Sequence, residues 1–178
     1  MPKHIENLQE RILETAKGEL LASDYNGFTI RSVAKQCGIA VGTIYNYYKS
    51  KDILAASVML MDWNKALSAM RHGSATSVTI TEGFHVIYKE IINFDSLYSG
   101  VWSQITFTGE FASEYSKRHK LLLSQLAEII HTLLLRFHME QEEYLTCFMA
   151  ENLLLAAMQR SEFDPLADIF NRILIPIK

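Results

Sequence analysis

The residues best suited to contact another molecule lie between Thr29 and Lys51. This stretch carries four cationic side chains and neither Asp nor Glu. The cations are Arg31, Lys35, Lys49 and Lys51. Because Lys and Arg neutralise the phosphates of nucleic acids, a cationic stretch without carboxylates is typical of a DNA-contacting surface.

Two short helices are predicted to position these side chains. The first runs from about Thr29 to Cys37, with Thr29 as its N-cap. Its apolar residues are spaced i, i+3, i+4 and i+7, which places them on one face. They are Ile30, Val33, Ala34 and Cys37. Gly38 fits the left-handed position that follows a helix end, where a Cβ would clash.

The second helix is predicted from about Ala40 to Tyr48, with Ile44 and Tyr48 on its buried face. Its other residues are small or able to form hydrogen bonds. Two short helices joined by a glycine turn predict a helix-turn-helix, whose second helix enters a DNA major groove.

Composition predicts an all-α protein. The chain has 178 residues, of which 49% are apolar, and it contains only 8 Gly and 3 Pro. Long periodic segments without hairpin signals favour helices. The net charge is −3, so the chain as a whole is not a general polyanion binder. Residues 1–52 nevertheless have a net charge of +1, whereas residues 53–178 have −4.

About nine helices are expected, in a helix-turn-helix domain over residues 1–50 and a helical bundle over residues 51–178. Ser50 is the predicted N-cap of a helix from Lys51 to about Arg71, followed by a loop over residues 72–77. Asp164 is the predicted cap of the last helix, with Pro165 in its first position. The other predicted segments are a helix over 3–22, a turn over 24–27, helices over 80–93, 109–138, 141–161 and 165–175, and an irregular piece or short helix over 96–107.

No signal for a membrane or for a redox site is apparent. The chain has no secretory signal and no run of 18 apolar residues, which predicts a soluble, cytoplasmic protein without a membrane partner. Cys37 and Cys147 both fall at apolar helix positions, so we expect them to be small buried hydrophobes rather than a disulfide or a redox switch.

Other titratable residues form no recognisable catalytic or metal-binding arrangement. His131 and His138 are seven residues apart on one predicted helix, without a carboxylate at ligand spacing. Glu110 and Glu114 are four apart, as solvated carboxylates on a helix often are. No nucleophile triad or phosphate loop is present. We therefore expect no enzyme activity, no metal and no cofactor.

The segment from Gly27 to Leu54 resembles the N-terminal DNA-binding domain of TetR-family transcriptional regulators. It reads GFTIRSVAKQCGIAVGTIYNYYKSKDIL. The shared pattern is a Gly-aromatic pair, a Val-Ala pair, a glycine turn, a Gly-x-Ile-Tyr-x-x-aromatic segment and Ser-Lys-Asp-x-Leu. The resemblance implies an all-α fold whose C-terminal bundle serves ligand binding and dimerisation. One departure is Ala40, where the family often has a capping Ser, so no phosphate contact is expected from that side chain.

By matching position, the resemblance implies a DNA-binding role for nine residues. Val41, Thr43 and Tyr45 are the candidates for base-edge contact, and Gly42 lets the backbone approach closely. Phosphate contacts are expected from Thr29, Arg31, Tyr47 and Lys51, with Asn46 less defined in role. Tyr48 is expected in the core, and Lys35 on a solvated face.

The resemblance also implies a ligand pocket and a dimer interface in the bundle. Candidate pocket residues are Trp63, Phe84, Tyr88, Trp102, Phe107 and Phe111, although ordinary core packing is the favoured explanation for any single one of them. Candidate dimer residues are Phe148, Leu155, Ile169, Phe170 and Ile173. A two-fold dimer would present two recognition helices to a palindromic operator, at half-sites about 34–36 Å apart or a multiple of that spacing.

The resulting hypothesis is a dimeric repressor that binds double-stranded DNA and is released by a small apolar or amphipathic effector. Two alternatives within this class remain open, namely control by a partner protein and activation of transcription. An interaction module with loose DNA binding, and an enzyme with an incidental helix-turn-helix, are the rivals from other classes.

Overall fold

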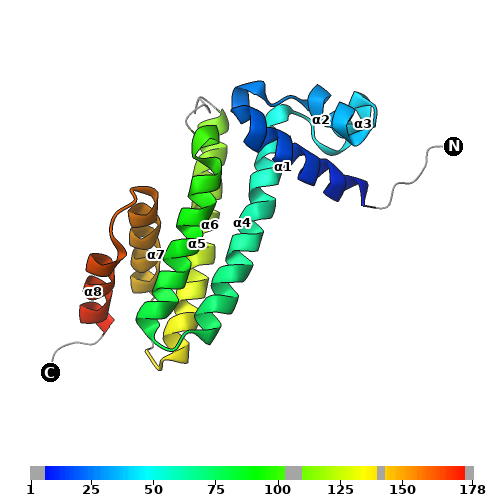
Figure 1. The fold of residues 1–178 in the computed structure, drawn as a ribbon. Coiled ribbons are helices and arrows are strands. Elements are labelled where there is room, and N and C mark those ends of the chain that lie inside the picture. Colours follow the sequence, from blue (N-terminus) through cyan, green and yellow to red (C-terminus); the bar gives the residue numbers. More distant parts are fainter. Residues whose placement is uncertain (1–6, 103–109, 140–142, 175–178) are drawn as a thin grey trace. The chain divides into compact units, whose positions relative to one another are not determined.

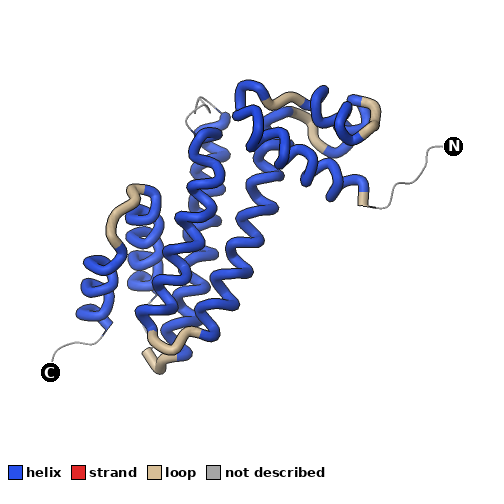
Figure 2. Tube along the Cα trace, viewed as in Figure 1, coloured by secondary structure: helices blue, strands red, loops and turns tan. Residues whose placement is uncertain are grey.

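The structure, a computed structural model, describes residues 7–102, 110–139 and 143–174. All regular secondary structure in these ranges is helical, which confirms the predicted fold class (Figure 2). The described residues form eight helices, labelled in Figure 1. They are α1 (Leu8–Gly27), α2 (Ile30–Cys37), α3 (Val41–Tyr47), α4 (Lys51–Thr76), α5 (Ile80–Trp102), α6 (Glu110–Arg136), α7 (Glu143–Met158) and α8 (Phe163–Leu174).

The chain forms two compact units. The first comprises Met1–Trp63 and Leu97–Thr106, and the second comprises Asn64–Ser96 and Phe107–Lys178. Helices α4 and α5 therefore each contribute one part to both units. The functional boundary at residue 50 that the sequence suggests stays a prediction.

Phe28 of the first unit is fully buried. The apolar faces of α1, α2 and α3 are buried in the same unit, and for α2 and α3 they are the faces that the apolar spacing predicted. The buried side chains are Ile12, Ala16 and Leu20 of α1, Ile30, Val33, Ala34 and Cys37 of α2, Ile44 of α3, and Tyr48 just beyond it. This core fixes the helix-turn-helix from behind and leaves the opposite faces of α2 and α3 exposed.

The turn predicted after α1 is present as a break within its last turn. Asp24 has φ 59° and ψ −178°, far from helical values. Its Oδ1 accepts hydrogen bonds from the backbone N–H groups of Asn26 and Gly27, at 2.9 and 3.1 Å. Such local bonding by Asp starts a new turn and redirects the chain towards Phe28. The predicted start of this helix, at residue 3, lies outside the described residues.

The loop predicted over residues 72–77 is wrong, because α4 continues to Thr76. The hydroxyls that suggested a loop bond back within the helix instead: Ser74 Oγ donates to the Arg71 carbonyl at 3.3 Å, and Thr76 Oγ1 to the His72 carbonyl at 3.1 Å. Gly73 permits close packing, since a Cβ there would lie 2.6 Å from Cγ1 of Val86 on α5.

Of the two alternatives predicted for 96–107, an irregular piece or a short helix, the structure has a helix as far as Trp102, but it is continuous with the preceding one, because α5 runs from Ile80 to Trp102. Two expected helices thus merge into one, and residues 103–107 of that piece lie outside the described residues. Helix α8 begins at Phe163, so Asp164 and Pro165 occupy its first turn instead of marking the cap and first position.

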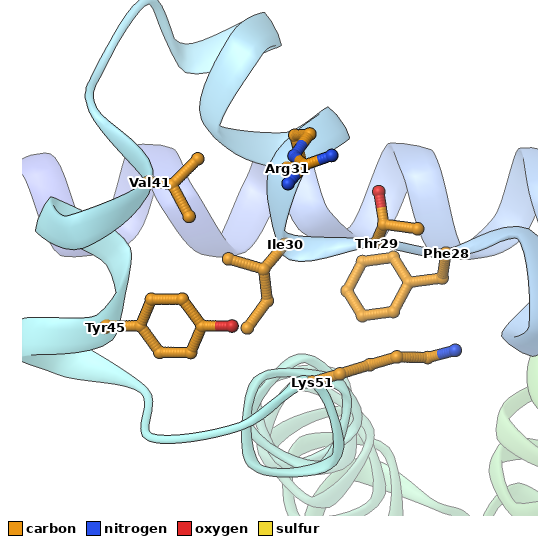
Figure 3. Close-up of a pocket in the computed structure, with 7 residues that line it drawn as sticks. All are labelled: Phe28, Thr29, Ile30, Arg31, Val41, Tyr45 and Lys51. Carbon is orange, nitrogen blue, oxygen red and sulfur yellow. The ribbon is translucent and has the colours of Figure 1, made fainter.

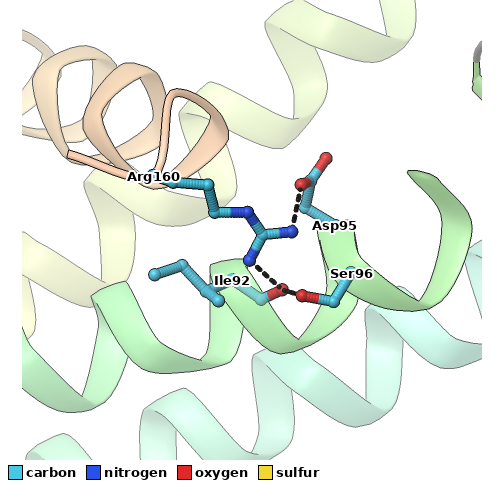
Figure 4. A network of polar contacts seen from close by, with 4 residues as sticks. All are labelled: Ile92, Asp95, Ser96 and Arg160. Carbon is cyan, nitrogen blue, oxygen red and sulfur yellow. Dashed lines mark hydrogen bonds and ion pairs between the residues drawn. The ribbon is translucent and has the colours of Figure 1, made fainter.

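In the second unit, two arginines tie loops to neighbouring helices. Arg136 at the end of α6 donates to the Ser74 carbonyl, Ser77 Oγ and the Ser77 carbonyl, at 3.2, 3.1 and 2.5 Å. Arg160, between α7 and α8, pairs with Asp95 of α5 at 2.8 Å and donates to the Ile92 carbonyl at 3.4 Å (Figure 4). Arg136 gives hydrogen-bond donors to carbonyls at the end of α4, and Arg160 attaches the α7–α8 connection to the middle of α5.

Candidate nucleic-acid interface

The helix-turn-helix has the local geometry that the sequence predicted. Thr29 Oγ1 accepts a hydrogen bond from the Ser32 backbone N–H at 3.1 Å and so caps α2. Gly38 adopts the left-handed conformation, with φ 65°. The backbone N–H of Ile39 donates to the Ala34 carbonyl at 3.0 Å, which closes the end of α2. These bonds set the angle at which the chain enters α3.

Helix α3 starts without a side-chain cap. Ala40 occupies the N-cap in an extended conformation and accepts no side-chain capping bond. An Ala at this position costs about 0.5–2 kcal/mol of helix stability relative to Ser or Thr. A helix of 7 residues depends on tertiary packing, and fully buried Ile44 provides it.

The outer face of α3 is polar and aromatic. Tyr45 and Tyr47 are 46% and 45% exposed, whereas Ile44, which directly precedes Tyr45, is fully buried. Asn46 and Gly42 are exposed, and Val41 and Thr43 are half-buried. Two tyrosines this exposed on a short, well-anchored helix gain little from the core of their own unit, so they are available to a partner.

A pocket of about 390 Å³ lies beside this face (Figure 3). It brings together five of the nine predicted DNA-binding residues from three helices and the N-cap of α2, namely Thr29, Arg31, Val41, Tyr45 and Lys51. Phe28 and Ile30 complete the lining. Gly42, Thr43, Asn46 and Tyr47 lie along α3 without lining the pocket. Two cations at an open pocket suit an anionic group.

Sequence reasoning missed Tyr25, which lies next to Lys51. The Lys51 ammonium lies over the Tyr25 ring, with Nζ 4.3 Å from the ring centroid. The Tyr25 hydroxyl donates a hydrogen bond to the Asp52 carboxylate. Partial burial, this hydrogen bond and the Asp52 charge all raise the pKa of Tyr25, in that order. No sequence motif signals this contact, because 26 positions separate Tyr25 from Lys51.

The predicted pocket residues and the predicted dimer residues differ in burial. Trp63, Phe84 and Tyr88 are buried, and the Phe84 ring packs 5.1 Å from the Phe170 ring, centroid to centroid. Phe107 and the side chains of Trp102 and Phe111 lie outside the described part of the structure.

Of the predicted dimer residues, Phe148, Leu155, Ile169 and Ile173 are 38%, 54%, 50% and 39% exposed. Phe170 is fully buried, so its assignment to an exposed apolar face is wrong. Its position on α8 turns the ring inwards, onto Phe84.

The remaining candidate groups form no catalytic arrangement among the described side chains. His131 and His138 are exposed, and the side chains of Glu110 and Glu114 lie outside the described part. Within the described ranges, no three His, Cys, Asp or Glu side chains are grouped so as to hold a metal ion. None of the described helices combines the length and hydropathy needed to cross a membrane.

Cys37 is buried as predicted, but Cys147 is exposed because α7 turns Thr146 and Met149 inwards instead.

Comparison with known proteins agrees with this geometry. Residues 12–58 match the family described as "Bacterial regulatory proteins, tetR family". A curated relative is the HTH-type transcriptional regulator UidR of Escherichia coli (strain K12), 25% identical over 104 residues. That alignment covers 58% of this chain and 50% of UidR, so the chain spans about half the length of this relative.

Solved structures share the fold. A transcriptional regulator from Cytophaga hutchinsonii aligns with a TM-score of 0.68 and 16% identity, over 94% of this chain and 95% of its own. FadR from Bacillus subtilis, solved in complex with stearoyl-CoA, aligns with a TM-score of 0.57 and 16% identity, over 96% of this chain and all of its own length. The curated relatives are named as transcriptional regulators and not as enzymes. The match over residues 12–58 and these relatives show that the chain contains a helix-turn-helix domain similar to that of the tetR family of bacterial regulatory proteins.

Proposed function

We propose that this chain regulates transcription by reading a specific DNA sequence through α3. The observation that carries the proposal is the pair of exposed tyrosines, Tyr45 and Tyr47, on a helix anchored by buried Ile44. Helix α2 and the start of α4 supply cations on the same unit. A short helix with hydrogen-bonding side chains, flanked by Lys and Arg, suits a major groove between two phosphate backbones.

The residues divide between base reading and phosphate contact. Thr43 and Tyr45 would hydrogen-bond base edges, and Val41 would touch a thymine methyl group. Arg31 and Lys51, at the pocket beside α3, would hold a phosphate. Tyr47 would donate to a phosphate across the groove, while Thr29 Oγ1 already serves as the α2 cap and would contribute from its exposed side. Gly42 and Asn46 lie on the exposed face and would allow close approach to the bases.

The same proposal includes a homodimer on a palindromic operator. Four exposed apolar side chains on α7 and α8 support it, and their spacing keeps each pair on one helix face: Phe148 with Leu155, and Ile169 with Ile173. Packing these faces against a second copy would remove apolar surface from water. A two-fold pair would also supply the second recognition helix, which roughly squares the selectivity of one half-site.

We further propose that the regulator is a repressor released by an apolar or amphipathic small molecule. Release by a small molecule is typical of TetR-family regulators, and FadR, a protein of the same fold, was solved in complex with stearoyl-CoA. A ligand that prefers the conformation unsuited to the operator must weaken DNA binding by the factor by which DNA weakens its own binding.

The test begins with selection of duplexes from a random library on the full chain, followed by fluorescence anisotropy with the selected duplex and with a scrambled duplex of equal length. We expect tight binding to the selected duplex and only weak, salt-sensitive binding to the scrambled one. Thr43→Ala and Tyr45→Ala should weaken binding to the selected duplex by about 5- to 150-fold each, the range for losing a base contact worth 1–3 kcal/mol.

Lys35→Ala provides the matched control, because Lys35 is exposed on α2 and does not line the pocket. It should lower binding to both duplexes by the same small factor. Equal affinity for the selected and the scrambled duplex would contradict sequence-specific reading. Sedimentation of the free chain as a monomer at micromolar concentration, with one chain per selected duplex, would contradict the dimer.

A further inference from the structure

Tyr25, Lys51 and Asp52 form a contact group at the edge of the pocket beside α3. Tyr25 lies in the last turn of α1, and the other two open α4. All three belong to the first unit. The Lys51 ammonium lies over the face of the Tyr25 ring, and the Tyr25 hydroxyl donates to the Asp52 carboxylate. The tyrosine thus contacts both a cation and an anion that are neighbours in sequence.

The two contacts have different physical roles. The hydrogen bond to a charged acceptor is directional and fixes the ring plane. The ring face then attracts the ammonium through its quadrupole. An ammonium carries three N–H donors, and a ring takes up only one side of it. The remaining donors of Lys51 stay available to an anion at the pocket that Lys51 lines with Arg31.

Without such support, Lys51 would sample many rotamers. Lys is among the side chains that lose most conformational entropy when they are fixed in a complex. Asp52 would also draw the neighbouring ammonium towards itself. The Tyr25 ring holds the Lys51 ammonium, and the Tyr25 hydroxyl bonds the Asp52 carboxylate. These contacts reduce both the rotamer freedom of Lys51 and its attraction to Asp52 in the free protein.

We propose that Tyr25 is a positioning residue, which pre-orients Lys51 for a DNA phosphate by holding its ammonium on the ring and keeping Asp52 engaged through the hydroxyl. This inference rests on the proposed function, since it concerns how well a DNA contact is prepared. It adds a residue that contributes to DNA affinity without touching DNA.

The experiment is a double-mutant cycle on the full chain, with anisotropy on one fixed 20-base-pair duplex at low salt. The variants are Tyr25→Phe, Tyr25→Leu, Lys51→Ala and the two double substitutions. We expect Tyr25→Leu to weaken DNA binding by about two- to tenfold, the cost of ordering one long side chain. Tyr25→Phe keeps the ring and should lie between wild type and Tyr25→Leu. Both effects should vanish once Lys51 is Ala, because no ammonium then remains to be positioned.

Two readouts separate positioning from a general structural effect. In the free protein, the ε-methylene protons of Lys51 should show an upfield ring-current shift that Tyr25→Leu abolishes and Tyr25→Phe reduces. Replacing Lys35 in place of Lys51 supplies the control cycle: Lys35→Ala and Tyr25→Leu should combine additively, since Lys35 is exposed and does not line the pocket. Thermal melts of every variant identify any that have lost the fold, and Tyr25→Phe keeps the test valid if Tyr25→Leu has done so.

The outcomes distinguish this inference from the proposed function. If wild type binds duplex and Lys51→Ala weakens it, but the Tyr25 variants bind as wild type or combine additively with Lys51→Ala, the positioning role is refuted and the proposed function stands. Tighter binding by Tyr25→Leu would also refute it, because Tyr25 would then be withholding Lys51 from DNA. If wild type fails to bind any duplex even at low salt, the proposed function fails, and the positioning role fails with it whatever the ring-current shift shows.

Discussion

Removing the Tyr98 hydroxyl should measurably destabilise the first unit. Tyr98 of α5 is fully buried, and its hydroxyl donates to Asp62 Oδ2 at 2.7 Å. Asp62 of α4 is itself only 6% exposed and pairs with Lys17 Nζ of α1 at 2.7 Å. The three side chains join three helices around a buried carboxylate. Such a charge is tolerated because hydrogen bonds replace its lost hydration.

The expected magnitude follows from the nature of the acceptor. A hydrogen bond to a charged group contributes about 1.5–3 kcal/mol, more than a bond between neutral groups. Tyr98→Phe keeps the ring and removes one donor from Asp62, so the free energy of unfolding should fall by about that amount. For a chain of this size each kcal/mol lowers Tm by roughly 2–4 °C, which predicts a decrease of about 3–12 °C.

Tyr48→Phe is the matched control in the same unit. Tyr48 is 4% exposed, and among the described residues its hydroxyl forms no hydrogen bond within normal distance and angle limits, although the Gln9 side chain lies close enough to affect its pKa. Burial raises the pKa of this hydroxyl more than the nearby Gln9 side chain lowers it. Deleting a buried hydroxyl without a partner should leave stability unchanged or raise it slightly.

Urea unfolding followed by circular dichroism compares the two Tyr→Phe variants with wild type. The expected result is a clear loss for Tyr98→Phe and none for Tyr48→Phe. The reasoning is refuted if the two substitutions have equal effects, because hydrogen bonding to a buried charge would then contribute nothing beyond deletion of an oxygen atom.

Three further predictions concern stability. Arg136→Met should destabilise the second unit by about 1.5–3 kcal/mol, because three acceptors lose a charged donor. Arg71→Ala breaks only an exposed ion pair with Glu128 and should cost under about 0.5 kcal/mol. The midpoints of urea unfolding compare the two variants. Gly83→Ala should cost about 1–3 kcal/mol of stability, because the added Cβ would lie 2.5 Å from Leu133 Cδ1. Gly18 is exposed with no neighbour near the added Cβ, so Gly18→Ala should stabilise α1 by up to about 1 kcal/mol. We expect opposite shifts in Tm, and shifts of the same sign would contradict this reasoning. Stability should also fall as pH rises above about 10, because burial and Asp62 raise the folded-state pKa of Tyr98, so only the unfolded chain loses that proton; urea midpoints at pH 9 and 11 should differ less in Tyr98→Phe than in wild type.

Much of the helix-turn-helix could be predicted because its signals are local. Thr29 caps α2 through a bond to Ser32, three residues away, and Ser50 accepts from the Ile53 backbone N–H at 3.1 Å in the same way. Gly38 relieves a clash within its own residue. The period of apolar side chains placed Ile44 and Tyr48 in the core. The residues that interact here are only a few positions apart, so apolar periodicity and capping residues are sufficient to predict these contacts.

The helical bundle was harder to predict from the sequence, because the same residue types occur both in loops and in packed helices. Serines and a glycine over residues 72–77 suggested a loop, yet Ser74 bonds within α4 and Gly73 permits contact with Val86. Apolar spacing alone also could not separate Phe170, which meets Phe84, from Ile169, which is exposed. Both distinctions depend on which helix lies opposite.

The sequence by itself therefore determined the fold class, the positions of α2 and α3 and the family that the helix-turn-helix resembles. These depend on hydrogen bonds and steric limits that act within about one helical turn. Only the tertiary structure decided that Lys51 lies against Tyr25, that Asp62 is buried between Lys17 and Tyr98, and that Phe170 faces inwards. Such contacts join residues many positions apart, and they form only when separate helices pack together and exclude water between them.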